Sequence, residues 1–98
     1  MSFFERLIST DKGKRLHQQE RVILEATELI CEILEQQNVS RAELATRLNS
    51  SRGHITQLLD GRANMTLRTL SDIFHALGHE MHLSSLKQAR PEPSSFSR

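Results

Sequence analysis

Five arginines gather in a short stretch of the chain that holds only two acidic residues, Glu43 and Asp60. The arginines are Arg41, Arg47, Arg52, Arg62 and Arg68. A guanidinium group binds carboxylates and phosphates through a planar fork of N–H donors. The net charge of the whole chain is only +1, but an approaching polyanion meets the local charge. This pattern favours a polyanion-binding surface between residues 40 and 68.

The segment from residue 40 to residue 61 has the pattern of two short helices joined by a tight turn. Ser40 is suited to cap the first helix, and Glu43 three residues later can complete a capping box. Asn49 tolerates the left-handed backbone conformation of a tight helix exit. Ser51 then caps the second helix. The apolar faces of the two helices are predicted at Leu44, Ala45, Leu48, Ile55, Leu58 and Leu59.

These residues resemble the helix-turn-helix regulators of the Xre family, which are similar to phage repressors. The likeness covers Val39 to Leu83 and rests on the order LA-x-x-L, turn, S-x-x-x-I-T-x-L-L-x-G. The run GRANMTLRTLSDIFHALG also resembles the loop and next helix of the family. In the turn, Asn49 and Ser50 stand where the family usually has glycine and an aliphatic residue. The resemblance implies a DNA-binding domain whose second motif helix enters the major groove.

Side chains on the outward side of the second helix, near its start, match the base-reading positions of the family. They are Arg52, Gly53, His54, Thr56 and Gln57. Arg52 can donate two hydrogen bonds to guanine, and Gln57 can pair with adenine. Gly53 reads no base, but it would let the helix approach the groove closely. The alternative for Arg52 is an ordinary solvated arginine.

Phosphate contacts are expected from the helix starts and the flanking loops. The predicted residues are Arg41, Ser51, Arg62, Asn64, Thr66 and Arg68. The family often uses the place of Arg41 for a backbone contact. A plain surface position is the alternative for Arg68.

The rest of the chain predicts an all-α, five-helix, phage-repressor-like domain with additions at both ends. A short helix over residues 2–9 and a break near residues 10–14 form an N-terminal extension. A long helix follows over residues 15–37, with an apolar stripe from Leu16 to Leu34. Its glutamates form a solvated face, or a face that repels DNA. Thr66 caps a last helix over residues 67–77, whose core face includes Leu67.

Alternating polar and apolar residues over 79–86 predict a terminal β-strand. Since a lone strand has no partner in a helical domain, it would pair with a second copy across a dimer axis, or with another protein. Met81 and Leu83 are the predicted dimer residues, and relatives of this subtype resemble that arrangement. Residues 1–87 would thus form one domain, and residues 88–98, rich in Pro and Ser, a disordered tail.

No catalytic constellation, cofactor loop or metal site is predicted. His75, His79 and His82 are closely spaced, but no cysteine or paired carboxylate completes a site. The single Cys31 excludes an internal disulfide and fits a reducing cytoplasm. There is no signal peptide and no segment of transmembrane length, so we expect no membrane partner.

Three functions remain open on the sequence. The first is a sequence-specific transcriptional regulator, most simply a repressor, that binds a palindromic DNA operator as a homodimer. The second, suggested by resemblance to small proteins of this subtype, is an antitoxin of a type II module that binds a toxin protein and represses its own operon. The third is a protein-interaction adaptor that has lost DNA binding. None of the three is an enzyme.

Overall fold

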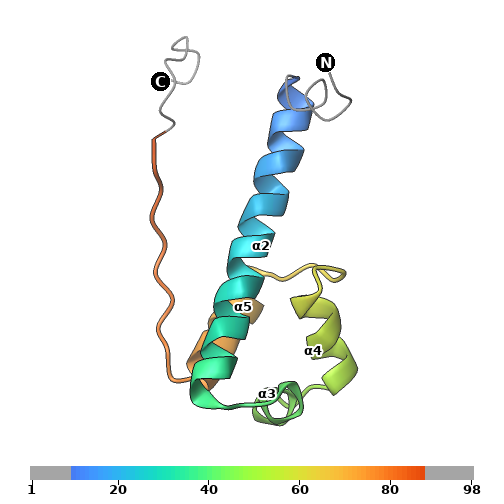
Figure 1. The fold of residues 1–98 in the computed structure, drawn as a ribbon, viewed down its shortest axis with the longest axis vertical. Coiled ribbons are helices and arrows are strands. Elements are labelled where there is room, and N and C mark those ends of the chain that lie inside the picture. Colours follow the sequence, from blue (N-terminus) through green and yellow to red (C-terminus); the bar gives the residue numbers. More distant parts are fainter. Residues whose placement is uncertain (1–9, 88–98) are drawn as a thin grey trace.

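A computed structural model describes residues 10–87, and these residues form an all-α fold (Figure 1). Its four helices are α2 (Asp11–Gln37), α3 (Arg41–Arg47), α4 (Arg52–Leu59) and α5 (Leu67–Ala76). The predicted helix over residues 2–9 and the predicted tail over residues 88–98 lie outside the described residues. Of the five predicted helices, the structure therefore tests four.

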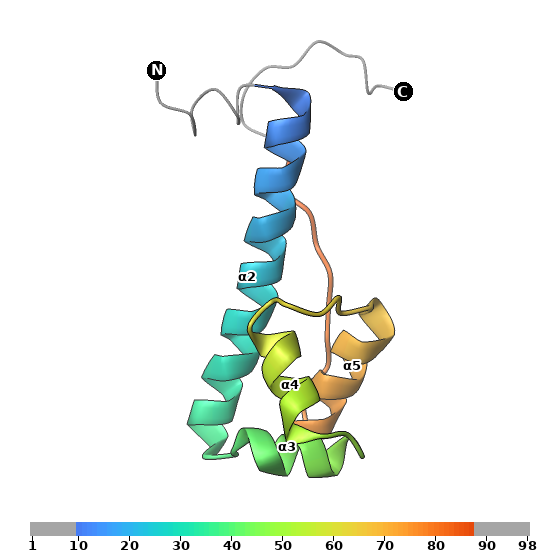
Figure 2. The ribbon, with the colours of Figure 1, turned by 90° about the vertical axis from the view of Figure 1, so that its right-hand side faces the viewer.

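The three short helices gather around the C-terminal half of α2, and the N-terminal half of α2 projects beyond them (Figures 1 and 2). A helix of 27 residues is about 40 Å long, so α2 forms the long axis of the molecule. Residues 79–87 run back from the end of α5 in the direction of the N-terminus of α2 (Figure 1).

One core joins the four helices, and each helix contributes one fully buried side chain. These are Ile30, Leu44, Ile55 and Ile73, each at most 1% exposed. Ile33, Leu34, Ala45, Leu58, Leu59, Phe74 and Leu77 surround them. Each fully buried aliphatic side chain stabilises the fold by about 1.5–3 kcal/mol relative to exposure, so this cluster fixes the mutual angles of the helices.

Each of the four helices begins at a Ser or Thr cap, whose side chain accepts a hydrogen bond from the backbone N–H three residues later. The caps are Thr10, Ser40, Ser51 and Thr66. Beyond each helix lies a residue of positive φ, the conformation that Asn and Gly tolerate best. These residues are Asn38, Asn49, Gly61 and Gly78. The predicted caps Ser40, Ser51 and Thr66 and the predicted left-handed turn at Asn49 are confirmed.

The predicted break over residues 10–14 is wrong, because α2 begins at Asp11 instead of Arg15. Thr10 Oγ1 accepts from the backbone N–H of Gly13 at 2.9 Å and caps the helix, which begins four residues before its predicted start. A single glycine weakens a helix by only about 1 kcal/mol, so Gly13 does not interrupt it. Residues 11–14, assigned to a loose extension, are therefore part of the long helix.

The predicted apolar stripe of α2 is only half buried. Ile30 and Leu34 lie in the core, but Leu16 is 43% exposed and Ile23 is 39% exposed. The core ends near Ile23, whose Cγ2 would lie 3.6 Å from a Cβ placed on Gly61 in the loop after α4. Leu67, predicted in the core, is 63% exposed at the start of α5. Helical periodicity marks an apolar face but does not tell how far along the helix a neighbour covers it.

Two long side chains bind the C-terminal end of α5. Gln37 Nε2 donates to the carbonyl of Leu77 at 2.7 Å, and an Arg47 N–H donates to the carbonyl of Ala76 at 3.0 Å. Arg47 also pairs with Glu43 at 2.7 Å, which holds its guanidinium in place. These bonds satisfy carbonyls that a helix end leaves without an internal partner. One of the five clustered arginines thus serves the fold.

The strand predicted over residues 79–86 is not present in the described part of the chain. These residues are extended but form no ladder, and the His79 N–H donates back to the Phe74 carbonyl at 2.8 Å to close the end of α5. A strand is defined by pairing, which a single extended segment cannot provide for itself. Met81 packs against the core, whereas Leu83 is 74% exposed.

Replacing Ala45 with leucine tests the close approach of α3 and α4. Ala45 is 3% exposed, so the larger side chain should overpack the core and lower the free energy of unfolding by about 1–3 kcal/mol. Ala42→Leu, at an exposed position of the same helix, is the control and should change it by less than about 0.5 kcal/mol. Urea denaturation followed by circular dichroism measures both. Equal stabilities would show that the two helices are not tightly packed here.

Candidate nucleic-acid interface

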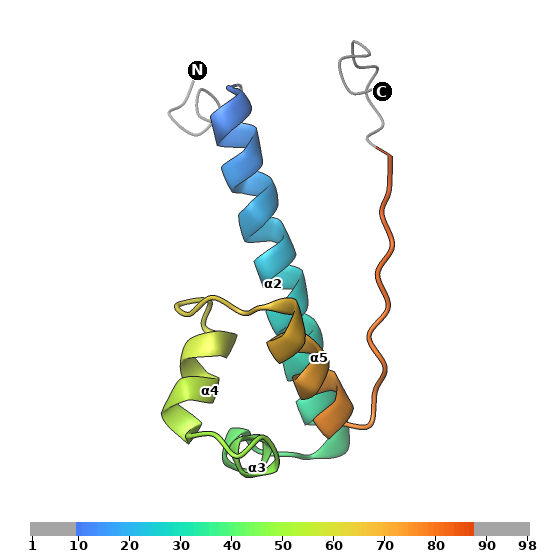
Figure 3. The ribbon, with the colours of Figure 1, turned by 180° about the vertical axis from the view of Figure 1, so that it is seen from behind.

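The outward side of α4 presents the residues predicted to read bases. Arg52, Gly53, His54 and Gln57 are exposed, and Thr56 is half-buried. The opposite side of α4 is held by Ile55, Leu58 and Leu59, which are at most 7% exposed. Because the buried side fixes the rotation of α4 about its axis, the exposed side chains keep a defined direction. Figure 3 shows α4 at the edge of the molecule, on the side opposite to residues 79–87.

The turn between α3 and α4 is short and is closed by backbone hydrogen bonds. The Ser50 N–H donates to the Ala45 carbonyl at 2.8 Å, and the Asn49 N–H donates to the Thr46 carbonyl at 3.1 Å. Ser51 Oγ then accepts from the His54 N–H at 3.0 Å and starts α4. The left-handed Asn49 thus fulfils the backbone role that glycine has in the family pattern. As a result, the first turn of α4 is positioned by α3.

The residues predicted to contact phosphate divide into three groups. Ser51 and Thr66 cap α4 and α5, so their hydroxyl oxygens already accept from backbone N–H groups. Asn64 and Arg68 are exposed in the loop before α5 and in its first turn. Arg41 and Arg62 are brought together by a group that the prediction did not include, the carboxylate of Asp60.

Asp60 pairs with both arginines. Its Oδ2 lies 3.0 Å from Arg62 Nη2, and its Oδ1 lies 3.8 Å from Arg41 Nη1. Sequence spacing gives a clue to the Asp60–Arg62 contact, since the residues are two apart. No sequence signal links either of them to Arg41, because that contact depends on how α3 and α4 pack.

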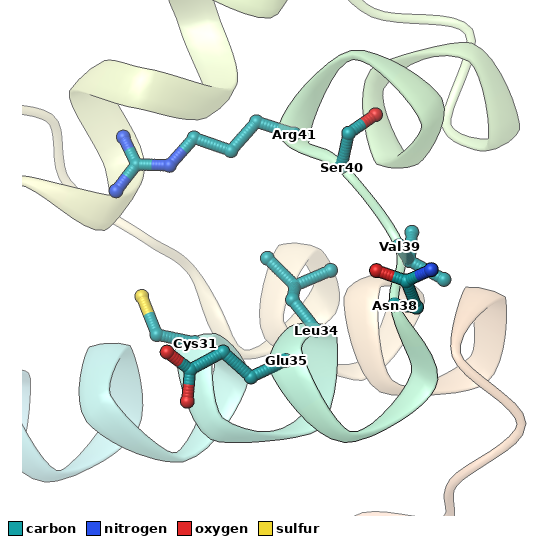
Figure 4. Close-up of a pocket in the computed structure, with 7 residues that line it drawn as sticks. All are labelled: Cys31, Leu34, Glu35, Asn38, Val39, Ser40 and Arg41. Atoms are coloured by element: carbon teal, nitrogen blue, oxygen red, sulfur yellow. The ribbon is translucent and has the colours of Figure 1, made fainter.

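An open pocket of about 480 Å³ lies between the end of α2 and the start of α3 (Figure 4). Cys31 and Glu35 line it from α2, and Arg41 extends along its opposite side.

Within residues 10–87 no three His, Cys, Asp or Glu side chains lie where they could hold a metal ion. His82 Nε2 lies 3.4 Å from Glu80 in the extended segment. No helix in the same range of the chain is both long enough and apolar enough to cross a membrane.

The geometry just described is that of a helix-turn-helix. The model of the helix-turn-helix family HTH_3 matches residues 32–80, half of the chain, from the last turns of α2 to just beyond α5. The chain therefore belongs to this family of Xre- and Cro-like domains, which bind DNA and are not enzymes. No curated protein and no solved structure matches the chain. The family model begins at Glu32, so most of α2 lies outside the shared part.

Replacing Gly53 with alanine tests how much this glycine weakens α4. Nothing lies within 4 Å of a Cβ placed on Gly53, so alanine should raise the free energy of unfolding by up to about 1 kcal/mol. Gly61→Ala is the matched control and should lower it, because Gly61 has φ +75°. Thermal denaturation of the free proteins measures both. A loss of stability in Gly53→Ala would contradict the open space seen around this residue.

Proposed function

We propose that this protein is a transcriptional regulator that binds a specific double-stranded DNA sequence, acts as a repressor and works as a homodimer in the cytoplasm. The observation that carries the proposal is the exposed first turn of α4, which a buried apolar side holds at a fixed angle in a helix-turn-helix. An α-helix fits the major groove, where each base pair presents its own pattern of donors and acceptors.

In this proposal, Arg52 and Gln57 read bases, with His54 and Thr56 beside them. Arg52 would donate two hydrogen bonds to guanine, and Gln57 would pair with adenine. Both side chains are exposed on α4, which supports the assignment. Gly53 would bring the helix backbone close to the base edges. Thr56 is half-buried, so of the five residues it has the least freedom to reach a base.

Phosphate contacts would orient the domain on the duplex. Arg68 and Asn64 are exposed close to α4 and suit this role best. Arg41 and Arg62 would contribute after exchanging the carboxylate of Asp60 for a phosphate. Ser51 and Thr66 would act through the helix starts that they cap.

A homodimer would place two copies of α4 about 34 Å apart, one turn of DNA, on a palindromic operator. The extended residues 79–87 support a dimer, because their backbone forms no ladder with any of the residues 10–87 and Leu83 and Leu86 are exposed. Pairing of this segment with its copy would satisfy the backbone groups.

An antitoxin function is the second candidate, and the N-terminal half of α2 favours it. Leu16 and Val22 are 43% and 63% exposed on the half of α2 that extends beyond the other helices. Exposed apolar side chains that follow one another along a helix are typical of a protein-binding surface. In this function a toxin protein would cover them, and DNA binding would regulate the operon. Co-purification of a partner that dissociates only in denaturant would distinguish this function from that of a simple repressor.

Selection of bound sequences from a random duplex library tests the DNA-binding proposal directly. The expected result is a palindromic sequence whose half-sites are about one DNA turn apart. Affinity for that duplex should fall steeply with added salt. Absence of salt-dependent binding to any duplex would favour the third reading, an interaction adaptor without DNA binding.

Replacing Arg52 with alanine should weaken binding to the selected operator by about 1–3 kcal/mol and relax the preference at one base pair. The reason is the loss of a bidentate contact to guanine. Arg21→Ala removes the same charge from an exposed position on α2 and serves as the control. Fluorescence anisotropy with the operator and its single-base variants measures both effects. Unchanged affinity and preference in Arg52→Ala would show that this residue does not read a base.

Replacing Leu83 with aspartate should shift the dimer towards the monomer, because the charge would be buried at a paired strand. Leu83 suits this test better than Met81, which packs against the core of its own chain. Ser84→Asp, an exposed position whose side chain would point to the opposite face of the strand, places the same charge nearby as a control. Sedimentation velocity measures the distribution. An unchanged profile for Leu83→Asp would exclude this segment as the dimer interface.

A further inference from the structure

Asp60 lies at an unusual position for a carboxylate. It is the C-cap residue of α4, where the partial negative charge of the helix end disfavours another negative charge. The last turn of α4 holds no basic residue that would compensate. The negative charge of Asp60 is instead balanced by Arg41 on α3 and by Arg62 in the loop after α4. The carboxylate thus joins the first turn of the first motif helix to the end of the second.

All three side chains of this cluster remain open to solvent. Asp60 is 42% exposed, Arg41 38% and Arg62 65%. A phosphate of a docked duplex can therefore reach both guanidinium groups without any rearrangement of the core. It would, however, meet the Asp60 carboxylate, which accepts a hydrogen bond from Arg62 Nη2 and lies 3.8 Å from Arg41 Nη1.

We propose that Asp60 acts as an internal substitute for a DNA phosphate. It holds Arg41 and Arg62 in the free protein and limits how strongly the domain binds DNA. A duplex must exchange a phosphate for this carboxylate, so part of the positive charge is not available for nonspecific binding. The inference rests on the proposed DNA-binding function and extends it to the control of affinity.

The alternative is that Asp60 orients the two arginines for DNA, in which case its loss would weaken binding. For Arg41, the geometry argues against this, although Arg62 is hydrogen-bonded to Asp60 at 3.0 Å. The Arg41 contact, at 3.8 Å, is longer than the 2.7–2.9 Å of a charge-assisted hydrogen bond, so it orients the guanidinium only loosely. Exposed ion pairs also contribute little to stability, and the protein should fold without this one. The repulsion between the Asp60 carboxylate and a nearby phosphate should therefore affect DNA binding more than any orienting effect of Asp60.

Asp60→Asn tests the inference, because it removes the charge and keeps the size of the side chain. The probe is a labelled mixed-sequence duplex, since phosphate contacts do not depend on sequence. Affinity is measured from about 50 to about 200 mM salt by fluorescence anisotropy. The variant should make about one more net phosphate contact than the wild type. Its salt slope should therefore be steeper by about one, and its affinity near 0.1 M salt about five- to tenfold higher.

Glu28→Gln is the matched control. It makes the same change in net charge at an exposed position on α2, on the acidic face. A general effect of net charge would raise affinity equally in both variants and would overturn the inference. In an Arg62→Gln background, Asp60→Asn should gain less than it gains in the wild type. Asp60→Ser gives a second neutral side chain and should reproduce the gain.

The outcomes separate this inference from the proposed function. If the wild type binds the duplex and Asp60→Asn binds no better than Glu28→Gln, only the role of Asp60 is wrong. Weaker binding by Asp60→Asn would show an orienting role and would also overturn the inference. If neither the wild type nor the Asp60 variants bind any duplex, both the function and the inference fail.

Discussion

The fold depends on four aliphatic side chains that meet in one place. Ile30, Leu44, Ile55 and Ile73 come from four different helices, and none is more than 1% exposed. The buried side of α4 is therefore fixed against α3 and α2, and its outer side must face solvent. The direction of Arg52 follows from this packing and not from any bond that Arg52 makes itself. A short helix of eight residues would not hold such a direction alone, because isolated helices of that length are marginal in water.

The ends of the helices were the most predictable part of the fold. A Ser or Thr cap and a left-handed Asn or Gly are local signals, because the groups that they bond lie within a few residues. Ser40, Ser51, Thr66 and Asn49 were placed correctly for this reason. Thr10 carries the same signal but was not recognised, since Gly13 nearby suggested a break. The start of α2 shows that a cap outweighs a single glycine when the following residues favour a helix.

Contacts between distant residues could not be predicted in the same way. The hydrogen bond from Gln37 to Leu77 spans 40 residues, and that from Arg47 to Ala76 spans 29. Nor did composition distinguish the five arginines, although Arg47 serves the fold while Arg41 and Arg62 share Asp60. The exposed side of α4 was predicted because its apolar period identifies the buried side. The residues that surround this exposed side, such as Arg41 beside Asp60, are brought there by helix packing, which no local sequence pattern encodes.

Two apolar surfaces extend beyond the four-helix core in the described part of the chain. The N-terminal half of α2 and the extended residues 79–87 both expose apolar side chains, among them Val22 and Leu83. Most of α2 also precedes the residues that match the family, although Ile30 from this part lies in the core. A long helix with exposed aliphatic residues is costly in water unless another surface covers them. The core that positions α4 thus carries two apolar extensions. In the proposed function, these extensions would bind the protein that acts together with α4, which is either a second copy of this chain or a different protein.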